Sequence, residues 1–269
     1  MTKYIGILGC GWLGLPLGTS LIEQGYSVKG TTTSKEKIPL LREKGIEAYH
    51  ITLTENEVQG PIDEFLQAIS ILIIDIPPKL RGKGPKESYI AKMQLLKKAL
   101  KNATIKNILF ISSTAVYGDA EGTVNEKTVP VPSTLSGKQL VQSENLFKED
   151  CSFSTTIIRF GGLIGPNRHP ISMLAGKENL EGGSAPVNLI HLDDCIGIIA
   201  SIIENNHFGD VINAVYPEHP TKKQYYTNEA IKRNLPIPHY SDTNQKKYKK
   251  IKTCSIFLIK NYDFLTTIN

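Results

Sequence analysis

The feature that most constrains the fold of this chain is a glycine-spaced turn near its N-terminus. The apolar run YIGIL (residues 4–8) leads into GCGWLG, where Gly9, Gly11 and Gly14 have the spacing G-x-G-x-x-G, and a helix-like segment follows and ends at Gly25. A strand, a tight turn and a helix in this order open a βαβ unit, because the glycines permit the sharp turn and close helix–strand packing. The free N–H groups at the helix start also predict an anion site.

Strand-like and helix-like segments continue to alternate along the chain, which predicts a parallel sheet covered by helices. Two of the strand-like runs are apolar throughout, as expected for strands that are buried on both faces. The expected strands are 26–32, 46–53, 70–78, 105–114, 154–165 and 210–216. The expected helices are 34–45 with Ser34 as its N-cap, 62–69, 86–103, 134–149, 192–205 with Asp193 as its N-cap, and 221–234.

This order of elements predicts an α/β fold, a doubly wound parallel sheet of the Rossmann type with a small C-terminal subdomain that covers the substrate. The chain shows no internal repeat, no low-complexity tract and no long linker. We therefore expect one continuous structural unit, in which residues 1–160 form the nucleotide-binding core and residues 161–269 supply the remaining sheet elements and the subdomain.

Composition and charge exclude several classes of partner. The formal net charge is +5, and much of the excess lies in NQKKYKKIK, residues 244–252. A solvated basic face explains this run better than a nucleic-acid patch, because no aromatic-interleaved groove or nucleic-acid motif accompanies it. The longest apolar runs are too short to span a bilayer, and no signal peptide is expected before the first strand. We expect a small-molecule partner, no nucleic acid, no membrane, and a monomer or homodimer.

The four cysteines predict neither a metal site nor a disulfide framework. Cys10, Cys151, Cys195 and Cys254 form no C-x-x-C pair, so a zinc site is not expected. A reduced, cytoplasmic protein without a metal is the simplest interpretation.

The end of the second strand favours NADP(H) over NAD(H). An NAD site usually has Asp or Glu there to accept hydrogen bonds from the ribose 2′-OH. This strand ends instead in Thr31–Thr33, Ser34 and Lys35, and the first carboxylate is Glu36, which Lys37 follows. Hydroxyls and a lysine suit a 2′-phosphate, although Ser34 could be only a cap and Lys35 only a surface charge. The expected cofactor-binding residues are Gly9, Gly11, Trp12, Leu13, Gly14, Thr32, Thr33, Ser34, Lys35, Pro77, Pro78 and Ser112.

Three later motifs narrow the class of protein. SSTAVYG (112–118), RFGGLIGPNR (159–168) and VNLIHLDD (187–194) follow the glycine turn in this order. Together with it they resemble the extended short-chain dehydrogenases/reductases, the NAD-dependent epimerase/dehydratase group. The resemblance covers nearly the whole chain and implies hydride transfer between a nicotinamide and a small carbonyl or carbinol substrate. In that family the residue that matches Ser113 hydrogen-bonds the reacting oxygen.

The proton-transferring pair of that family does not fall in its usual place. The resemblance implies a Tyr-x-x-x-Lys motif, in which the lysine lowers the pKa of the tyrosine. A Glu often follows four residues later, and alignment on Glu144 puts Ser136 at the Tyr position and Leu140 at the Lys position. Lys138 is two positions away, which turns it about 200° around a helix. The chain therefore resembles the atypical extended members, which lack the pair but keep the glycine turn and a Pro-Pro after the fourth strand, here Pro77 and Pro78.

Several residues remain candidates for chemistry, each with a structural alternative. The expected catalytic residues are Ser113, Tyr117 and Lys138, and the expected substrate-binding residues are Thr114 and Arg168. Tyr117 could instead support its loop, and Arg168 could be a solvated loop residue. His191 is interpreted as a hydrogen-bonded structural residue, Arg159 as part of a structural ion pair, and Asp75 as a residue that binds loop amides or lines the cofactor pocket.

Two alternatives stay open at this point. The first 48 residues also resemble the start of a β-hydroxyacid dehydrogenase, but that family continues into an all-helical domain, whereas strands are expected here. The second alternative is a dinucleotide-binding module or sensor without turnover, which the displaced Tyr/Lys pair favours.

Overall fold

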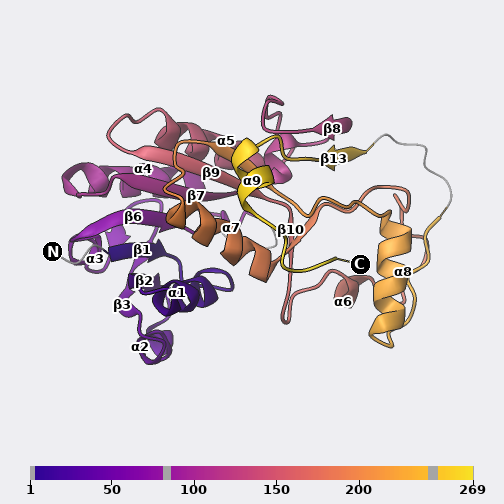
Figure 1. Ribbon diagram of the computed structural model, residues 1–269, viewed down its shortest axis with the longest axis horizontal. Helices are drawn as coiled ribbons and strands as arrows, with labels where there is room; N and C mark the ends of the chain where they lie inside the picture. The colour runs from indigo at the N-terminus through magenta and orange to yellow at the C-terminus, as the bar shows by residue number, and fades with distance from the viewer. Residues whose placement is uncertain (1–3, 81–85, 242–247, 269) are drawn as a thin grey trace.

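A seven-stranded parallel sheet forms the centre of the protein (Figure 1). The computed structural model describes residues 4–80, 86–241 and 248–268. The strand order is β12-β9-β7-β6-β1-β2-β3, and every neighbouring pair is parallel. The strands are β1 (Tyr4–Leu8), β2 (Ser27–Thr32), β3 (Glu47–His50), β6 (Ile69–Ile74), β7 (Asn107–Ser113), β9 (Ser154–Phe160) and β12 (Val211–Ala214). The prediction of a Rossmann-type α/β fold is confirmed, and the order reverses between β1 and β6, where such sheets bind ligands.

Helices cover both faces of the sheet because successive strand side chains point to opposite faces. On β7, Leu109 packs into the core of one face, while Ile108 and Phe110 pack into the core of the other. The first face is covered by α1 (Gly14–Glu23), α2 (Ile38–Glu43), α7 (Leu192–Glu204) and α9 (Ile256–Asn261). The second face is covered by α3 (Ile62–Leu66), α4 (Tyr89–Ala99) and α5 (Leu135–Lys148).

Side-chain oxygens and one imidazole cap the N-termini of several of these helices. Thr134 caps α5 by accepting a hydrogen bond from the Gly137 N–H. The prediction that Asp193 caps α7 is wrong, because His191 Nδ1 accepts from the Asp193 N–H and so takes the cap position. Ser34 does precede a short 3₁₀ turn (Lys35–Lys37), but its hydroxyl makes no capping hydrogen bond to the turn.

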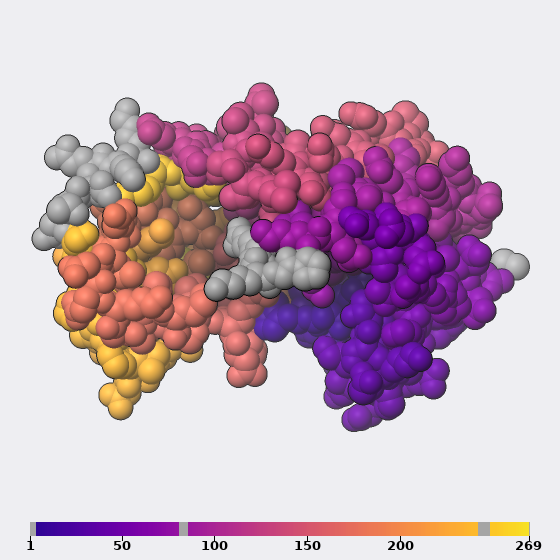
Figure 2. All heavy atoms as spheres, turned by 180° about the vertical axis from the view of Figure 1, so that it is seen from behind, coloured from indigo at the N-terminus to yellow at the C-terminus, as the bar shows by residue number. Residues whose placement is uncertain are grey.

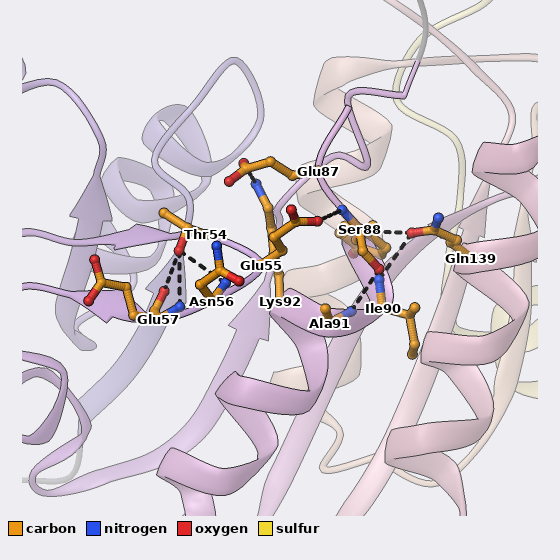
Figure 3. A network of polar contacts seen from close by, with 11 residues as sticks. Thr54, Glu55, Asn56, Glu57, Glu87, Ser88, Ile90, Ala91, Lys92 and Gln139 are labelled. Carbon is orange, nitrogen blue, oxygen red and sulfur yellow. Dashed lines mark hydrogen bonds and ion pairs between the residues drawn. The ribbon is translucent and has the colours of Figure 1, made fainter. Parts of the chain in front are cut away.

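A polar network ties a short hairpin to two helices on the second face (Figure 3). The hairpin consists of β4 (Thr52–Leu53) and β5 (Val58–Gln59), and its Glu55 carboxylate accepts from the Ser88 N–H at 2.8 Å. The Gln139 side chain on α5 accepts from the Tyr89 N–H at 2.6 Å and the Ile90 N–H at 3.1 Å. Donors at the start of α4 are thereby satisfied from both neighbouring elements.

The C-terminal third both returns to the sheet and extends beyond it (Figure 1). β12 is the edge strand next to β9, and β10 (Gly162–Ile164) pairs with β11 (Leu189–His191). β8 (Gly122–Val124) pairs with β13 (Lys249–Ile251). A third apolar core lies between α6 (Ile171–Leu174) and α8 (Lys222–Lys232). It is built around Ile171, Tyr225, Tyr226 and Ala230.

Two properties of the described residues bear on function. None of the helices formed by these residues is long and apolar enough to cross a lipid bilayer. In the same residues no group of three His, Cys, Asp or Glu side chains is placed to hold a metal ion.

Candidate functional site

The glycine turn stands at the carboxyl end of β1, and each of its glycines has a different steric role. Gly9 has φ +115°, and a Cβ on it would lie 2.4 Å from the Asp75 carbonyl oxygen. A Cβ on Gly14 would lie 2.2 Å from the Gly9 carbonyl oxygen. A Cβ on Gly11 would meet no heavy atom within 4 Å. The fold itself therefore requires Gly9 and Gly14, whereas Gly11 leaves space above the turn.

Unpaired N–H groups border that space at the start of α1. Within the described residues, no hydrogen bond uses the backbone N–H of Trp12 or Leu13, and no side chain caps α1. The first turn of this ten-residue helix also contains no acidic residue. Free amides at the positive end of a helix dipole suit phosphate oxygens. The residues present therefore fit the pyrophosphate of a dinucleotide, as the sequence predicted for Gly11, Trp12 and Leu13.

Two side chains fix the shape of the turn from neighbouring strands. Thr31 on β2 is buried, and its hydroxyl accepts from the Gly9 N–H at 3.0 Å. Asp75, directly after β6, accepts a hydrogen bond from the Gly14 N–H. Burial raises the pKa of Asp75 to about 8, although the Gly14 hydrogen bond and the charge of Arg168 oppose the shift. Asp75 thus contacts the turn through its carboxyl group, whose charged form is disfavoured by burial.

The segment after β2 contains groups that would attract a 2′-phosphate and one carboxylate that would repel it. Thr32 is buried, and its hydroxyl accepts from the Ser34 N–H at 3.2 Å, while Thr33 and Lys35 are exposed. The Ser34 hydroxyl donates to the Glu36 carboxylate at 2.6 Å, and this hydrogen bond lowers the pKa of Glu36. A carboxylate that sequence reasoning set aside is therefore hydrogen-bonded to one of the predicted phosphate ligands.

A buried polar network holds two of the predicted site residues. The Ser112 hydroxyl donates to Glu144 at 2.5 Å, and Glu144 forms an ion pair with Arg159 at 2.6 Å. Arg159 also donates to the Tyr117 hydroxyl at 2.9 Å, and Tyr117 in turn lies 2.9 Å from the Asn213 side-chain oxygen. The predicted structural ion pair of Arg159 is confirmed. Ser112 and Tyr117 meet protein groups in the interior, and burial raises the pKa of Tyr117.

The two remaining catalytic candidates, Ser113 and Lys138, and the predicted substrate-binding residue Thr114 lie in three different environments. Ser113 ends β7, and its oxygen accepts from the Ala115 N–H at 3.2 Å, so its hydroxyl proton can still be donated. Thr114 is buried at the start of a short 3₁₀ turn, Thr114–Tyr117. Lys138 is exposed on α5, whereas Leu140, at the position of the family lysine, is buried in the apolar core. No polar contact between described residues brings Lys138 to Ser113.

The loop after β10 brings another predicted residue to the glycine turn. The Trp12 indole N–H donates to the Pro166 carbonyl oxygen at 3.1 Å. The Arg168 guanidinium lies over the Trp12 ring, 4.8 Å from its centroid. Pro77 is exposed and Pro78 half-buried two and three residues after Asp75. Arg168, predicted to contact substrate, is thus held beside the predicted cofactor residues.

A pocket of about 750 Å³ lies beside Gly118, and sequence reasoning missed most of its polar lining. Figure 2 shows a hollow here, between magenta residues of the middle of the chain and orange and yellow residues of the C-terminal third. Lys222, Tyr226, Tyr248 and Lys249 supply its cationic and aromatic groups. The other walls come from residues 118–121 and 185–189. The motifs SSTAVYG and VNLIHLDD end and begin in these walls, which was the one available signal in the sequence.

Lys249 corrects the interpretation of the basic run 244–252 as a solvated face. Residues 244–247 lie outside the described part of the chain, and Lys249 belongs to β13. Its ammonium group donates to the Gly118 carbonyl oxygen. Burial lowers the pKa of Lys249, and the nearby Asp119 carboxylate opposes this shift. The prediction of a solvated face is wrong for Lys249, because long-range strand pairing turns it toward the pocket.

The fold and the glycine turn define a Rossmann-type α/β protein of the extended short-chain dehydrogenase/reductase type. Residues 5–215 match the model of the NAD dependent epimerase/dehydratase family, and the chain belongs to that family. Strands β9 and β12, in the half where a β-hydroxyacid dehydrogenase would be all-helical, agree with this assignment.

Comparison with known proteins supports the same family. Protein YeeZ of Escherichia coli (strain K12) is 35% identical over 242 residues, which cover 90% of this chain and 88% of YeeZ. The structure of MoeE5 in complex with UDP-glucuronic acid and NAD has a TM-score of 0.79 at 19% identity, covering 99% of this chain and 95% of that one. The Bacillus cereus UDP-glucuronic acid 4-epimerase, in complex with UDP-glucuronic acid and NAD, has a TM-score of 0.78 at 18% identity, with coverage of 99% and 95%. At these identities the two structures show the shared fold.

Proposed function

We propose that this protein binds NADP(H) at the glycine turn and transfers hydride to or from a small, phosphate-bearing carbonyl or carbinol substrate. One observation carries the proposal. The free N–H groups of Trp12 and Leu13 face a turn on which Gly11 leaves space, at the switch point of the sheet. When bound, the nicotinamide would supply the hydride donor or acceptor, and the protein's own groups would orient the substrate and move its proton.

The preference for NADP(H) rests on the residues after β2. Exposed Thr33 and Lys35 suit a 2′-phosphate, and Thr32 fixes the bend by accepting from the Ser34 N–H. Glu36 works in the other direction, because a carboxylate repels a phosphate and accepts from a ribose hydroxyl. Since the Glu36 carboxylate already accepts from the Ser34 hydroxyl, we assign the stronger attraction to Lys35 and the threonine hydroxyls.

The substrate class follows from the pocket beside Gly118. Lys222 and Lys249 supply positive charge for a phosphate, and Tyr226 and Tyr248 supply aromatic faces for a base or sugar ring. The Asp119 and Glu121 carboxylates of the same pocket can accept hydrogen bonds from sugar hydroxyls. The pocket begins immediately after the 3₁₀ turn Thr114–Tyr117, which Ser113 precedes. Two structural neighbours carry UDP-glucuronic acid together with NAD. We therefore propose a sugar nucleotide as the first substrate class to test.

Within this proposal Ser113 orients the reacting oxygen, because its hydroxyl proton is free to be donated. Tyr117 stays a structural residue of the buried network, and Lys138 stays on the exposed side of α5. The reacting proton then passes to a group of the substrate or to water. In this assignment the proton transfer that the family's Tyr/Lys pair would perform takes place without a tyrosine of the protein.

The test is hydride exchange with the Ser113→Ala variant. Wild-type protein is incubated with NADP⁺ or NADPH and a panel that includes UDP-glucose and UDP-glucuronic acid, and nicotinamide absorbance is followed. Ser113→Ala should lower turnover about 100-fold while leaving nucleotide affinity unchanged, since it removes one hydrogen bond to the reacting oxygen. The exposed Ser133→Ala variant is the matched control. Unchanged turnover in Ser113→Ala would exclude this role.

The alternative is a dinucleotide-binding module without turnover. It is favoured by Leu140, which is buried in the apolar core at the position of the family lysine. Tight binding of the nucleotide with no hydride exchange on any substrate of the panel would support this second function over the first.

A further inference from the structure

We propose that Arg168 is a clamp for the pyrophosphate of the dinucleotide, delivered to the glycine turn by a loop from the other half of the chain. This inference rests on the proposed binding of a dinucleotide. It reassigns Arg168, which the sequence predicted to bind substrate. The loop consists of Gly165–Arg168, between β10 and α6.

The loop has a defined shape before any ligand binds. The Gly165 N–H donates to the Arg168 carbonyl oxygen at 2.9 Å, and the Arg168 N–H returns a hydrogen bond to the Gly165 carbonyl oxygen at 3.0 Å. Asn167, inside this turn, adopts a left-handed conformation with φ +57°. The turn therefore points its arginine in a set direction.

The loop is packed on Trp12 of the glycine turn. Besides the hydrogen bond from the indole to the Pro166 carbonyl oxygen, Gly165 approaches the ring closely. A Cβ on Gly165 would lie 3.1 Å from Trp12 Cζ2 and 3.0 Å from Leu192 Cβ, and its φ is +154°. Glycine at this position lets the loop approach Trp12 and the start of α7. Trp12 thus links segments that lie 154 residues apart in the sequence.

The arginine itself is available to an anion. Arg168 is exposed, its guanidinium lies on the Trp12 ring, and within the described residues it makes no ion pair closer than 4 Å. The carboxyl group whose pKa its charge lowers is Asp75, and burial raises that pKa to about 8, which disfavours the charged form that would neutralise the arginine. A positive charge without an ion-pair partner therefore lies on the side chain of Trp12, a residue whose backbone N–H is unpaired.

A diphosphate can bind both the unpaired N–H groups at the start of α1 and the guanidinium of Arg168. Its oxygens accept hydrogen bonds from backbone N–H groups at a helix start and form paired hydrogen bonds with a planar guanidinium. Arginine suits this geometry better than lysine, because its donors form a rigid fork. A carbonyl substrate would instead use groups near Ser113 and the pocket lysines.

The experiment compares the affinities of adenine compounds with and without phosphates for variants that include a pair of the same net charge. ADP, NADPH and adenosine are titrated by calorimetry into the wild-type protein and into Arg168→Met, Arg168→Lys and Lys101→Met. Lys101 is exposed in the 3₁₀ turn (Leu100–Asn102) before β7, at the opposite end of the sheet strands from the glycine turn. Lys101→Met therefore changes the net charge as Arg168→Met does, but far from the proposed site. Melting temperatures establish that every variant is folded.

We expect Arg168→Met to weaken ADP and NADPH binding about 10-fold or more and to leave adenosine binding within about twofold. Arg168→Lys should fall between Met and wild type, and Lys101→Met should match wild type. Trp12 is the only tryptophan of the chain, so ADP should also change its fluorescence, and Arg168→Met should reduce that change.

Wild-type affinity of Arg168→Met for ADP would overturn this inference and leave the proposed function in place. Equal weakening of adenosine and ADP would also overturn it, since the loss would then come from a distorted site. A wild-type protein that binds neither ADP, NADPH nor adenosine would remove both this inference and the proposed function.

Discussion

The carboxyl group of Asp75 should titrate near neutral pH rather than in the acidic range. Its pKa of about 8, raised by burial, means that the folded protein favours the protonated carboxyl. The charge of Arg168 opposes the rise in the pKa of Asp75. The charge of Asp75 in turn raises the pKa values of Cys10, Tyr89 and Cys195. The stability that this group contributes is fully present below its ordinary pKa and is lost as the pH rises through about 8.

Asp75→Asn should therefore remove part of the pH dependence of folding. Urea unfolding at several pH values from 5 to 9 should show the wild-type free energy of unfolding falling relative to that of Asp75→Asn up to about pH 8, with a constant difference above it. Asp63→Asn, at an exposed position of α3, is the control for the loss of a carboxylate. Parallel curves for wild type and Asp75→Asn would contradict the raised pKa.

Single residues also show how far the sequence could be read. Gly9, Gly11 and Gly14 were identified from their spacing, because the strand, turn and helix that they join are consecutive in the sequence. Tyr117 was named as a possible acid, yet its partners Arg159 and Asn213 come from β9 and β12. No local pattern reports which distant side chains a buried phenol will meet, so its place in the network required the structure.

At the scale of elements, the glycine turn separates what the fold needs from what a ligand needs. Gly14→Ala would place a Cβ 2.2 Å from the Gly9 carbonyl oxygen, whereas Gly11→Ala would place one in open space. Gly14→Ala should lower the free energy of unfolding by about 1–3 kcal/mol, because the helix must shift on its strand. Gly11→Ala should keep wild-type stability within about 0.5 kcal/mol and weaken nucleotide binding. Equal destabilisation by both changes in urea unfolding would contradict this division.

Strands and helices were predicted where their patterns are long and regular. The apolar segments that became β6 and β7 and the helix α4 follow directly from burial on both faces and from amphipathic spacing. The pairing of β8 with β13 could not be predicted, because three-residue strands that lie far apart in the sequence carry almost no pattern. That pairing decides the orientation of Lys249, and the basic run was misjudged for this reason.

At the scale of the whole molecule, function depends on contacts between the two halves of the chain. The sequence predicted the parallel sheet and the glycine turn, which are properties of consecutive residues. The pocket is lined by four separate segments from residue 118 to residue 249, and Arg168 meets Trp12 across the molecule. These arrangements arise only from the tertiary fold, so their residues were either missed or given another role.

The most direct test of the account is a parallel titration of the wild-type protein with NADPH and NADH, followed by nicotinamide fluorescence. The account predicts saturable binding with a blue-shifted emission, tighter for NADPH, and a clear loss of affinity in Gly11→Ala. Tighter binding of NADH would reverse the assignment of the residues after β2, with Glu36 as the ribose ligand. Absence of binding to either nucleotide would contradict the central claim and leave the glycine turn as a purely structural feature of the fold.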